Sequence, residues 1–511
     1  MSNSVENSSS TDLEMNPEKY SDSLPPMGLN KPYPPLLGQR DPYLVSFDGP
    51  SDPAHPFNFP LWKKKIPYCA TVGLCALSVS IGSAMFSQSI EEITEIYHVG
   101  WSVAALSTSL YVLGFAAGPI FYGPLSELFG RKFVLIPSSF GYICFSFLVG
   151  SAKDLQTILI CRFFAGFIGA APMVVSAAIM ADLFDYRSRG TAIVVYAMMI
   201  FGGPMIAPIM GGFTVKNSAL GWRWTSYFCG IIGAIALFMN VFVLEETRHP
   251  IILVRRAEEL RRRTGNWGIA APHEELRLNV KEIFSRSISK PLRMLITEPI
   301  LLLITIYHAF VYGLLYLLLT AIPFIYSGEY HFSPGVSELP YASMLIGVFI
   351  GGGIIIILEK KYVAAVMSNN GKLLPEKRLQ PMMVGCFTFV IGIFWLGWTG
   401  SYPQHIHWIV PTIGAAFVGN GLIMIFLPCF NYIIDCYLVN AASALAANTF
   451  LRASFAAAFP LFSKQMFENL TIKWATTLLG CIGVLLIPVP FVFHFYGKAI
   501  RKKSKYAFDL E

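Results

Sequence analysis

The sequence predicts an all-α membrane protein with twelve transmembrane helices arranged as two six-helix halves. The chain has 511 residues, of which 54% are hydrophobic and only 14% are charged, whereas soluble domains carry about 25% charged residues. It contains twelve apolar runs, each near the length of about 20 residues that crosses a bilayer. A charged segment at 245–298 separates the first six runs from the last six. We therefore expect lipid to surround most of the chain.

The apolar runs define the two halves. The first half covers 66–244, with runs near 66–88, 103–122, 133–151, 157–180, 190–213 and 222–244. The second half covers 299–497, with runs near 299–324, 340–358, 381–399, 408–433, 442–463 and 475–497. The run at 442–463 is the weakest, because it holds Arg452 and many alanines. This layout indicates two halves related by duplication, which is common in transporters.

The Lys and Arg residues predict the orientation of the chain. With the N-terminus inside, the cytoplasmic segments hold 31 of them and the outer loops hold five, as the positive-inside rule requires. The tails at 1–65 and 498–511 and the central loop at 245–298 are then cytoplasmic. The first tail is polar and Pro-rich, unlike a signal peptide, and we expect it to be mostly disordered. Orientation alone explains the net charge of +7, so we predict no nucleic-acid partner.

Motifs for enzymatic chemistry or for metal and cofactor binding are missing from the sequence. The nine cysteines lie in or beside apolar runs without a CxxC pair or Cys/His cluster, and we interpret them as small packing residues. No nucleophile–base pair or phosphate loop is recognisable. We therefore expect neither an enzyme nor a bound cofactor. Asn469-Leu-Thr471 is an outward-facing glycosylation sequon whose occupancy the sequence leaves open.

A short charged turn, Gly123-Pro-Leu-Ser-Glu-Leu-Phe-Gly-Arg-Lys132, joins the second and third runs as a tight hairpin. Its glycines, Gly123 and Gly130, allow close backbone geometry. Glu127 and Arg131 could pair across the hairpin and, with Lys132, form a charge latch that holds one face of the bundle shut. The alternative is a tight loop that only obeys the positive-inside rule.

The fifth run has an unusual density of glycine and proline: Gly202, Gly203, Pro204, Pro208, Gly211 and Gly212. In lipid such residues give a kinked helix with a bare face that a neighbour can approach. The eighth run offers a partner with Gly347, Gly351, Gly352 and Gly353. We predict a tight seam between the halves, with ordinary small-residue packing as the alternative.

Arg162 lies in the fourth run, where a buried arginine costs several kcal/mol, roughly 2.5–3.5 on insertion scales, unless it is paired or solvated. We expect it to face the interior of the bundle. The alternative is that it snorkels to the outer surface, because it sits only a few residues into the run.

These motifs together resemble the major facilitator superfamily, and within it the fungal twelve-span drug:proton antiporters that export polyamines and multiple drugs. The turn at 123–132 resembles the superfamily's motif between spans two and three, with Glu127 where Asp is usual. Arg162 matches the family's fourth-span arginine, which the resemblance associates with proton coupling. Residues 202–212 match the antiporter motif of the fifth span. Similarity to the fungal members lies at Val45–Pro60, Trp62–Lys64, Ala181–Phe184 with Arg187 and Arg189, and Gly221–Trp224.

Proton coupling needs a titratable group with alternating access, yet no acidic residue falls in the middle third of any predicted span. The candidates are Glu91 and Glu92 at the end of the first span, Asp435 at the end of the tenth, and His308 in the seventh. His308 could instead be a polar residue that lines the cavity. Seven further residues could line a substrate cavity: Tyr111, Tyr196, Asn240, Tyr307, Tyr312, Asn420 and Asn431.

The sequence thus predicts a secondary transporter that exports hydrophobic drugs, toxic metabolites or polyamines by alternating access, coupled to protons. The missing mid-span carboxylates favour neutral amphiphiles over polycations. The alternative is a passive facilitator or nutrient sensor on the same fold. We expect a monomer in the fungal plasma membrane, although a vacuolar membrane would give the same pattern.

Overall fold

The computed structural model describes residues 26–29, 31–32, 43–49, 51–185, 188–274, 280–369, 374–502 and 504–507. It divides into two compact units, which we describe separately. One unit comprises Met1–Phe59 with Glu246–Leu278, and the other comprises Pro60–Glu245 with Asn279–Glu511. The expected disorder of residues 1–25, 30, 33–42 and 50 and the resemblance at Arg187 lie outside the described residues.

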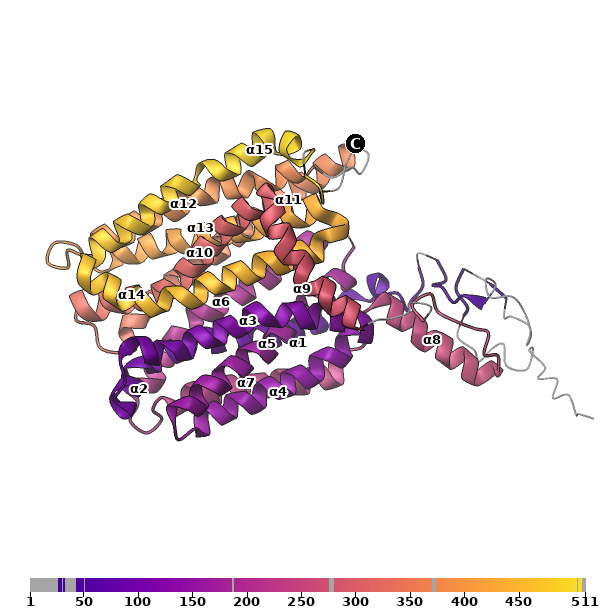
Figure 1. The fold of residues 1–511 in the computed structure, drawn as a ribbon, viewed down its shortest axis with the longest axis horizontal. Helices are drawn as coiled ribbons and strands as arrows, with labels where there is room; N and C mark the ends of the chain where they lie inside the picture. The colour runs from indigo at the N-terminus through magenta and orange to yellow at the C-terminus, as the bar shows by residue number, and fades with distance from the viewer. Residues whose placement is uncertain are drawn as a thin grey trace, which may run out of the picture. The chain divides into compact units, whose positions relative to one another are not determined.

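The larger unit begins with the N-terminal half (indigo to magenta in Figure 1). A short π-helix, η5 (Leu61–Lys65), leads into α1 (Ile66–Met85), which continues through η6 (Phe86–Ser89) into α2 (Ile90–Tyr97). The next helices are α3 (Trp101–Phe129), α4 (Arg131–Ser151), α5 (Leu155–Leu183), α6 (Arg189–Lys216) and α7 (Arg223–Val243). Local chemistry fixes their ends. Gly130 separates α3 from α4 with φ 101°, a conformation that favours glycine, and Asp154 caps α5 by accepting from the amide of Thr157 at 2.8 Å.

The C-terminal half (orange to yellow in Figure 1) begins with α9 (Val280–Thr297) and α10 (Pro299–Pro323), which continues into η7 (Phe324–Glu329). After η8 (Val336–Glu338) come α11 (Tyr341–Ser368), η9 (Pro375–Leu379), α12 (Gln380–Gly400), α13 (Ile409–Tyr437), η10 (Leu438–Asn440), α14 (Ala441–Leu486) and α15 (Pro488–Arg501). Thr471 breaks α14 with φ 61° and ψ 163°.

The described residues contain eleven continuous helical segments long and apolar enough to cross a membrane. The last of them, Ala441–Arg501, has 61 residues, about twice the length that a bilayer needs. The break at Thr471 divides it into the two spans predicted at 442–463 and 475–497. The prediction of an all-α fold with twelve spans is therefore confirmed.

The two halves of the bundle meet along two pairs of helices, α3 with α14 and α6 with α11. Within each half, glycines let equivalent helices approach closely. A Cβ at Gly166 on α5 would lie 2.0 Å from the Tyr111 carbonyl oxygen on α3. In the second half, a Cβ at Gly419 on α13 would lie 2.1 Å from the Met344 carbonyl oxygen on α11. Such contacts between small residues are the usual basis of helix association in lipid.

The glycine-rich stretch of α6 does not face one neighbour. Gly202 and Gly212 approach the C-terminal half at Leu345 and Glu338, whereas Gly203 and Gly211 approach Ser80, Met85 and Gln88 of α1 and η6. On α11, Gly352 approaches Met198 of α6, while Gly347 and Gly351 approach Ala416, Asn420 and Ile423 of α13. The seam expected between the halves therefore involves only some of these glycines, and the others bring helices of the same half together.

The smaller unit is built around α8 (His249–Thr264). Its buried cluster consists of Met27, Val45, Ala257, Leu260, Ile269 and Ala271. An isolated parallel bridge links Leu44 to Ala270, and Arg256 forms an ion pair with Asp52 at 3.0 Å. Described parts of the N-terminal tail therefore pack with the central loop.

Candidate functional site

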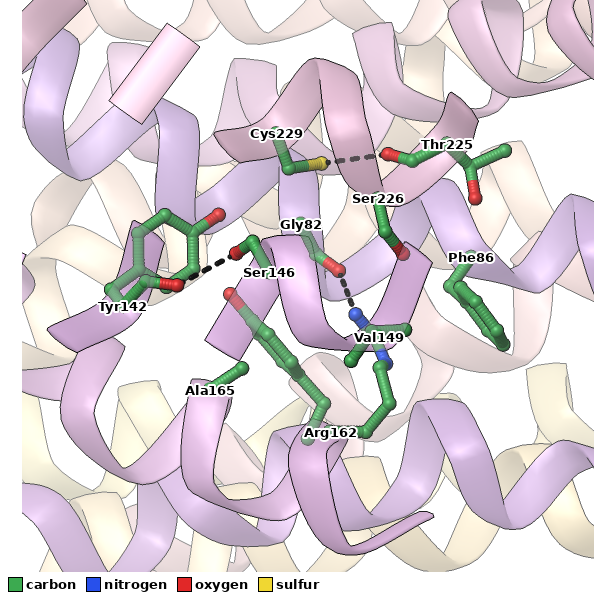
Figure 2. A pocket seen from close by; sticks show the side chains of 11 residues that line it. Gly82, Phe86, Tyr142, Ser146, Val149, Arg162, Ala165, Thr225, Ser226 and Cys229 are labelled. Carbon is green, nitrogen blue, oxygen red and sulfur yellow. Dashed lines mark hydrogen bonds between the residues drawn. The ribbon is translucent and has the colours of Figure 1, made fainter. Parts of the chain in front are cut away.

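Arg162, on α5, is a buried charge inside the N-terminal half (Figure 2). Its side chain is only 4% exposed. Its Nε donates to the carbonyl oxygen of Ser107 on α3 at 3.0 Å, and its Nη1 donates to that of Gly82 on α1 at 2.8 Å. Three helices are thus tied together by one guanidinium. Arg162 points into the half and does not snorkel to the surface.

Aromatic rings and a small cavity surround this arginine. The guanidinium carbon lies 4.3 Å from the ring centre of Tyr111 and 4.8 Å from that of Phe86, so cation–π attraction offsets part of the cost of burial. Its Nη2 is buried without a hydrogen-bond partner among the described residues. The cavity beside it is lined by Gly82, Phe86, Tyr111, Tyr142, Ser146, Val149, Arg162, Ala165, Thr225, Ser226 and Cys229.

The charged turn between α3 and α4 holds a buried ion pair. Arg131 is 4% exposed and donates through Nε to Asp182 at the end of α5 at 2.9 Å and through Nη1 to Ser126 at 2.7 Å. Glu127 is exposed, and among the described residues no ion pair joins it to Arg131. The expected pairing across the hairpin is therefore wrong, because Glu127 lies on the outer face of α3. Lys132 donates to the Val241 carbonyl oxygen at 3.2 Å.

A similar cluster occupies the same end of the C-terminal half. Arg378 in η9 contacts Glu359 of α11 at 2.5 Å and Asp435 near the end of α13 at 2.9 Å. The Tyr362 hydroxyl also donates to Asp435 at 2.9 Å. The positions match those of Arg131 and Asp182, so the duplicated layout extends to the charges. We call the end of the bundle with both clusters the turn end.

Residues from both halves meet in the middle of the bundle. The Tyr316 hydroxyl of α10 donates to Ser83 of α1 at 2.9 Å. Phe201 of α6 packs against Phe426 of α13 with ring centres 4.5 Å apart. The polar and aromatic centre therefore belongs to the interface between the halves and not to either half alone.

Two central residues of the C-terminal half are His308 on α10 and Arg452 on α14. His308 is fully buried, and neither ring nitrogen makes a well-aligned hydrogen bond to a described residue. The guanidinium of Arg452 lies 4.5 Å from the ring centre of Tyr312 and 4.8 Å from that of Phe426. Sequence reasoning treated Arg452 only as a weakness of its span, although a charge in the middle of an apolar run was the signal that could have identified it.

The end opposite the turn end contains a second residue that sequence reasoning missed. Glu338, just before α11, is 3% exposed and forms no ion pair with a described residue. It contacts Gln88 of η6 across the interface at 3.4 Å. Ser102 of α3 also crosses the interface there, donating to the Leu461 carbonyl oxygen at 3.2 Å. Glu338 was overlooked because it precedes its span by a few residues and resembles a loop position.

The remaining predicted residues occupy different places. Tyr196 and Asn240 bond to backbone carbonyls of Met173 and Thr71 inside the N-terminal half. Tyr307 is buried with its hydroxyl unpaired among the described residues. Glu91 is exposed, Glu92 is half-buried on α2, Asn420 approaches the glycines of α11, and Asn431 lines a second small cavity beside Arg378. Only Tyr312 and His308 of the predicted set reach the centre between the halves.

No group of three or more His, Cys, Asp or Glu side chains within the described ranges could hold a metal ion. The described residues at the centre offer aromatic faces and hydrogen-bonding groups for binding.

Comparison with known proteins identifies the family to which this chain is similar. The family model "Major Facilitator Superfamily" matches residues 72–460. The chain is 71% identical over 488 residues to the "Major facilitator superfamily multidrug transporter FLU1" of Candida albicans, covering 96% of this chain and 80% of that protein. It is 51% identical over 486 residues to the "Multidrug transporter TPO1_2" of Candida glabrata, covering 95% and 83%.

Solved structures agree on the fold. A partially occluded, inward-open structure of the xylose transporter XylE from E. coli superposes with a TM-score of 0.58 at 17% identity, covering 84% of this chain and 97% of that one. At this identity the likeness concerns the fold alone. The chain belongs to the Major Facilitator Superfamily, within its fungal drug-transporter family, and is a multi-pass membrane transporter.

Proposed function

We propose that this protein exports hydrophobic drugs or toxic metabolites from the fungal cytoplasm in exchange for protons, by alternating access to a site between its two halves. Polyamines are a separate candidate class of substrate, because the sequence resembles exporters that handle them. Two curated relatives carry the words "multidrug transporter" in their names, which supports a hydrophobic substrate class for this chain as well.

The observation that carries the proposal is the shared centre. Tyr316 and Ser83 join the halves by a hydrogen bond of 2.9 Å, and Phe201 reaches across to Phe426. A site assembled from both halves is exposed to one side or the other when they rock. Aromatic and polar groups in such a site suit flat, largely apolar compounds.

The turn end is proposed to be the cytoplasmic end, because the Lys and Arg residues concentrate there. The pair Arg131–Asp182 would then act with Gly123, Gly130 and Lys132 as the latch of that face. Its two members come from α4 and α5, so a motion between these helices would have to break a buried ion pair. Glu127, on the exposed face, has a smaller part in this proposal.

Glu338 supports the proton-coupling part of the proposal. A buried carboxylate without a cation is costly when ionised, and Glu338 lies where the halves touch. Separation of the halves would let water reach it, so the group could carry a proton in one state and release it in the other. Arg162, His308, Glu91 and Glu92 remain candidates for the same pathway. Asp435 is a weaker one, since Arg378 holds it in an ion pair.

We further propose that the protein works as a monomer in the plasma membrane with both termini cytoplasmic. One chain supplies both six-helix halves, so the rocking unit needs no second copy.

The test is transport by the purified full chain in proteoliposomes with an imposed pH gradient. Three labelled probes separate the substrate classes: a neutral azole, an aromatic carboxylate and spermidine. We expect accumulation of at least one probe that depends on the gradient and collapses when a protonophore is added. Movement that ignores the gradient would favour a passive facilitator, and movement of none would favour a sensor.

A further inference from the structure

Arg452 is a half-buried cation in the middle of a membrane span, and no described residue forms an ion pair with it. Its Nε is buried without a hydrogen-bond partner, and no ion pair or hydrogen bond links its guanidinium to the described part of the chain. It lies instead against the faces of Tyr312 and Phe426, at 4.5 and 4.8 Å from their ring centres. Cation–π attraction alone leaves its hydrogen-bond donors unused.

Arg162, the other arginine within a span, shows how the protein can satisfy such a charge. Both arginines lie within spans, but Arg162 donates to two backbone carbonyl oxygens at 2.8 and 3.0 Å. Its charge is therefore accommodated by the protein itself. A guanidinium kept in the bundle without such acceptors carries an uncompensated cost, and an anion supplied from outside would remove it.

The polar groups next to Arg452 are only partly satisfied by hydrogen bonds. The imidazole of His308 packs on Phe426 with ring centres 4.1 Å apart, is fully buried and leaves both nitrogens without a well-aligned hydrogen bond. Asn448 donates to Thr305 at 3.2 Å, and its side chain interacts with the His308 imidazole, although its buried Oδ1 makes no well-aligned hydrogen bond. We call the rings of Tyr312 and Phe426 the aromatic wall. Polar groups that lack part of their hydrogen bonds and lie together beside such a wall are typical of a binding site.

The aromatic wall belongs to the interface between the halves. Phe201 of α6 lies 4.5 Å from Phe426 and 6.4 Å from Tyr312 between ring centres. The Tyr312 hydroxyl lies 3.4 Å from that of Tyr316, which bonds to Ser83 of the other half. A ligand on Arg452 would therefore touch residues of both halves.

We propose that Arg452 binds the acidic group of the substrate, and that the preferred substrates are amphiphiles with one carboxylate on an aromatic or apolar body. The planar guanidinium matches a carboxylate in two-point geometry, and the faces of Tyr312 and Phe426 match the apolar body. A polyamine would meet a like charge at this point. The inference rests on the proposed export function and names the substrate class of its central site.

The experiment measures equilibrium binding, so it needs neither a gradient nor transport. Biphenyl-4-carboxylate and biphenyl-4-carboxamide have the same shape and differ in charge, and spermidine serves as the cationic probe. Each is titrated by calorimetry into the purified full chain in detergent at pH 7.5. Wild type should bind the carboxylate at least about tenfold more tightly than the carboxamide, as expected for a charge-assisted hydrogen bond.

Three variants make the result specific. Arg452→Met should abolish the preference while it retains carboxamide binding, and Arg452→Lys should keep part of it. Lys464→Met removes a cation from the same helix near the opposite end, where Lys464 contacts the Trp101 ring, and should leave the preference unchanged. Equal binding of the two biphenyls to wild type would overturn the proposal whether or not the variants fold. So would tighter binding of spermidine, or a carboxylate preference that survives Arg452→Met. Failed transport with intact carboxylate preference would count against export, not against the site.

Discussion

Arg162 and Arg452 are both arginines set within membrane spans, but their surroundings differ. Arg162 donates two hydrogen bonds to backbone carbonyl oxygens of α1 and α3. Arg452 has aromatic faces beside it and no acceptor among the described residues. The first arrangement holds three helices together, and the second leaves binding capacity unused. In a membrane span, an arginine whose donors bond to backbone carbonyls holds helices together, whereas one without acceptors keeps its donors available for a ligand.

The difference between the two arginines is tested most strongly by removing each guanidinium and measuring the stability of the protein against unfolding. Arg162→Met should lower the free energy of unfolding by about 3–6 kcal/mol, since two hydrogen bonds to a charged donor are lost at roughly 1.5–3 kcal/mol each, and should abolish transport. Arg452→Met should leave the unfolding temperature unchanged or raise it, because an unpaired buried charge disappears. Thermal unfolding in detergent and transport in proteoliposomes measure both. Equal destabilisation by the two substitutions, or wild-type transport by a correctly inserted Arg162→Met, would contradict the account.

Glu338 resembles Arg452 in that it forms no ion pair with any residue of the described chain, and it is buried. Glu338→Gln keeps the shape and the contact with Gln88 but cannot exchange a proton. We expect accumulation driven by a pH gradient to disappear while exchange of labelled for unlabelled substrate persists. Glu95→Gln, at an exposed acid on α2 that has no place in the proposed pathway, is the matched control and should accumulate substrate normally. Gradient-driven accumulation by Glu338→Gln would remove this residue from the proton pathway.

The two charge clusters of the turn end, one around Arg131 and one around Arg378, should differ less in what a single substitution does to stability. Asp182 is the carboxylate paired with Arg131, whereas Arg378 contacts both Glu359 and Asp435. Asp182→Asn breaks the buried ion pair with Arg131 and should therefore lower the free energy of unfolding by about 3–5 kcal/mol. Asp435→Asn should cost less, because Glu359 still neutralises Arg378. Thermal unfolding of the two variants decides the order, and a larger loss for Asp435→Asn would show that the clusters are not equivalent.

The smallest expected effect concerns Asp52 in the smaller unit. Burial raises the pKa of Asp52, but hydrogen bonds from the amides of Asp48 and Ala54 and the pairing with Arg256 outweigh it, so the net pKa lies below the ordinary value. A carboxyl whose pKa falls on folding stabilises the fold above its unfolded pKa and loses that contribution as pH drops through the folded value. Hydrogen exchange of α8 amides, corrected for intrinsic rates, should therefore accelerate below about pH 4. Asp52→Asn should show the faster exchange already at pH 7, and unchanged exchange there would refute the link.

Sequence reasoning succeeded where one physical variable dominates. Apolar length alone decides which segments span lipid, so the predicted runs match the helices, including the pair that Thr471 divides within α14. It failed where partners are set by packing. The expected pairing of Glu127 with Arg131 gave way to Asp182, which lies 51 positions along the chain. Asp435 looked like a proton carrier until Arg378 was found beside it.

The missed residues have a common cause. Arg452 and Glu338 are single charges without a motif, and their meaning depends on which partners they lack. Only the arrangement of the helices reveals that lack: Phe426 and Tyr312 face Arg452, and Gln88 from the other half covers Glu338. Sequence spacing could suggest these positions but not their unpaired state.

In the proposed mechanism, substrate and protons exchange through a site shared by the two halves. Its most direct test is the internal pH of proteoliposomes that hold the purified protein and a trapped pH-sensitive dye, recorded when substrate is added outside without any imposed gradient. The account predicts a substrate-dependent pH change in wild type that is absent in Glu338→Gln. Substrate uptake by wild type with no change in internal pH would contradict it.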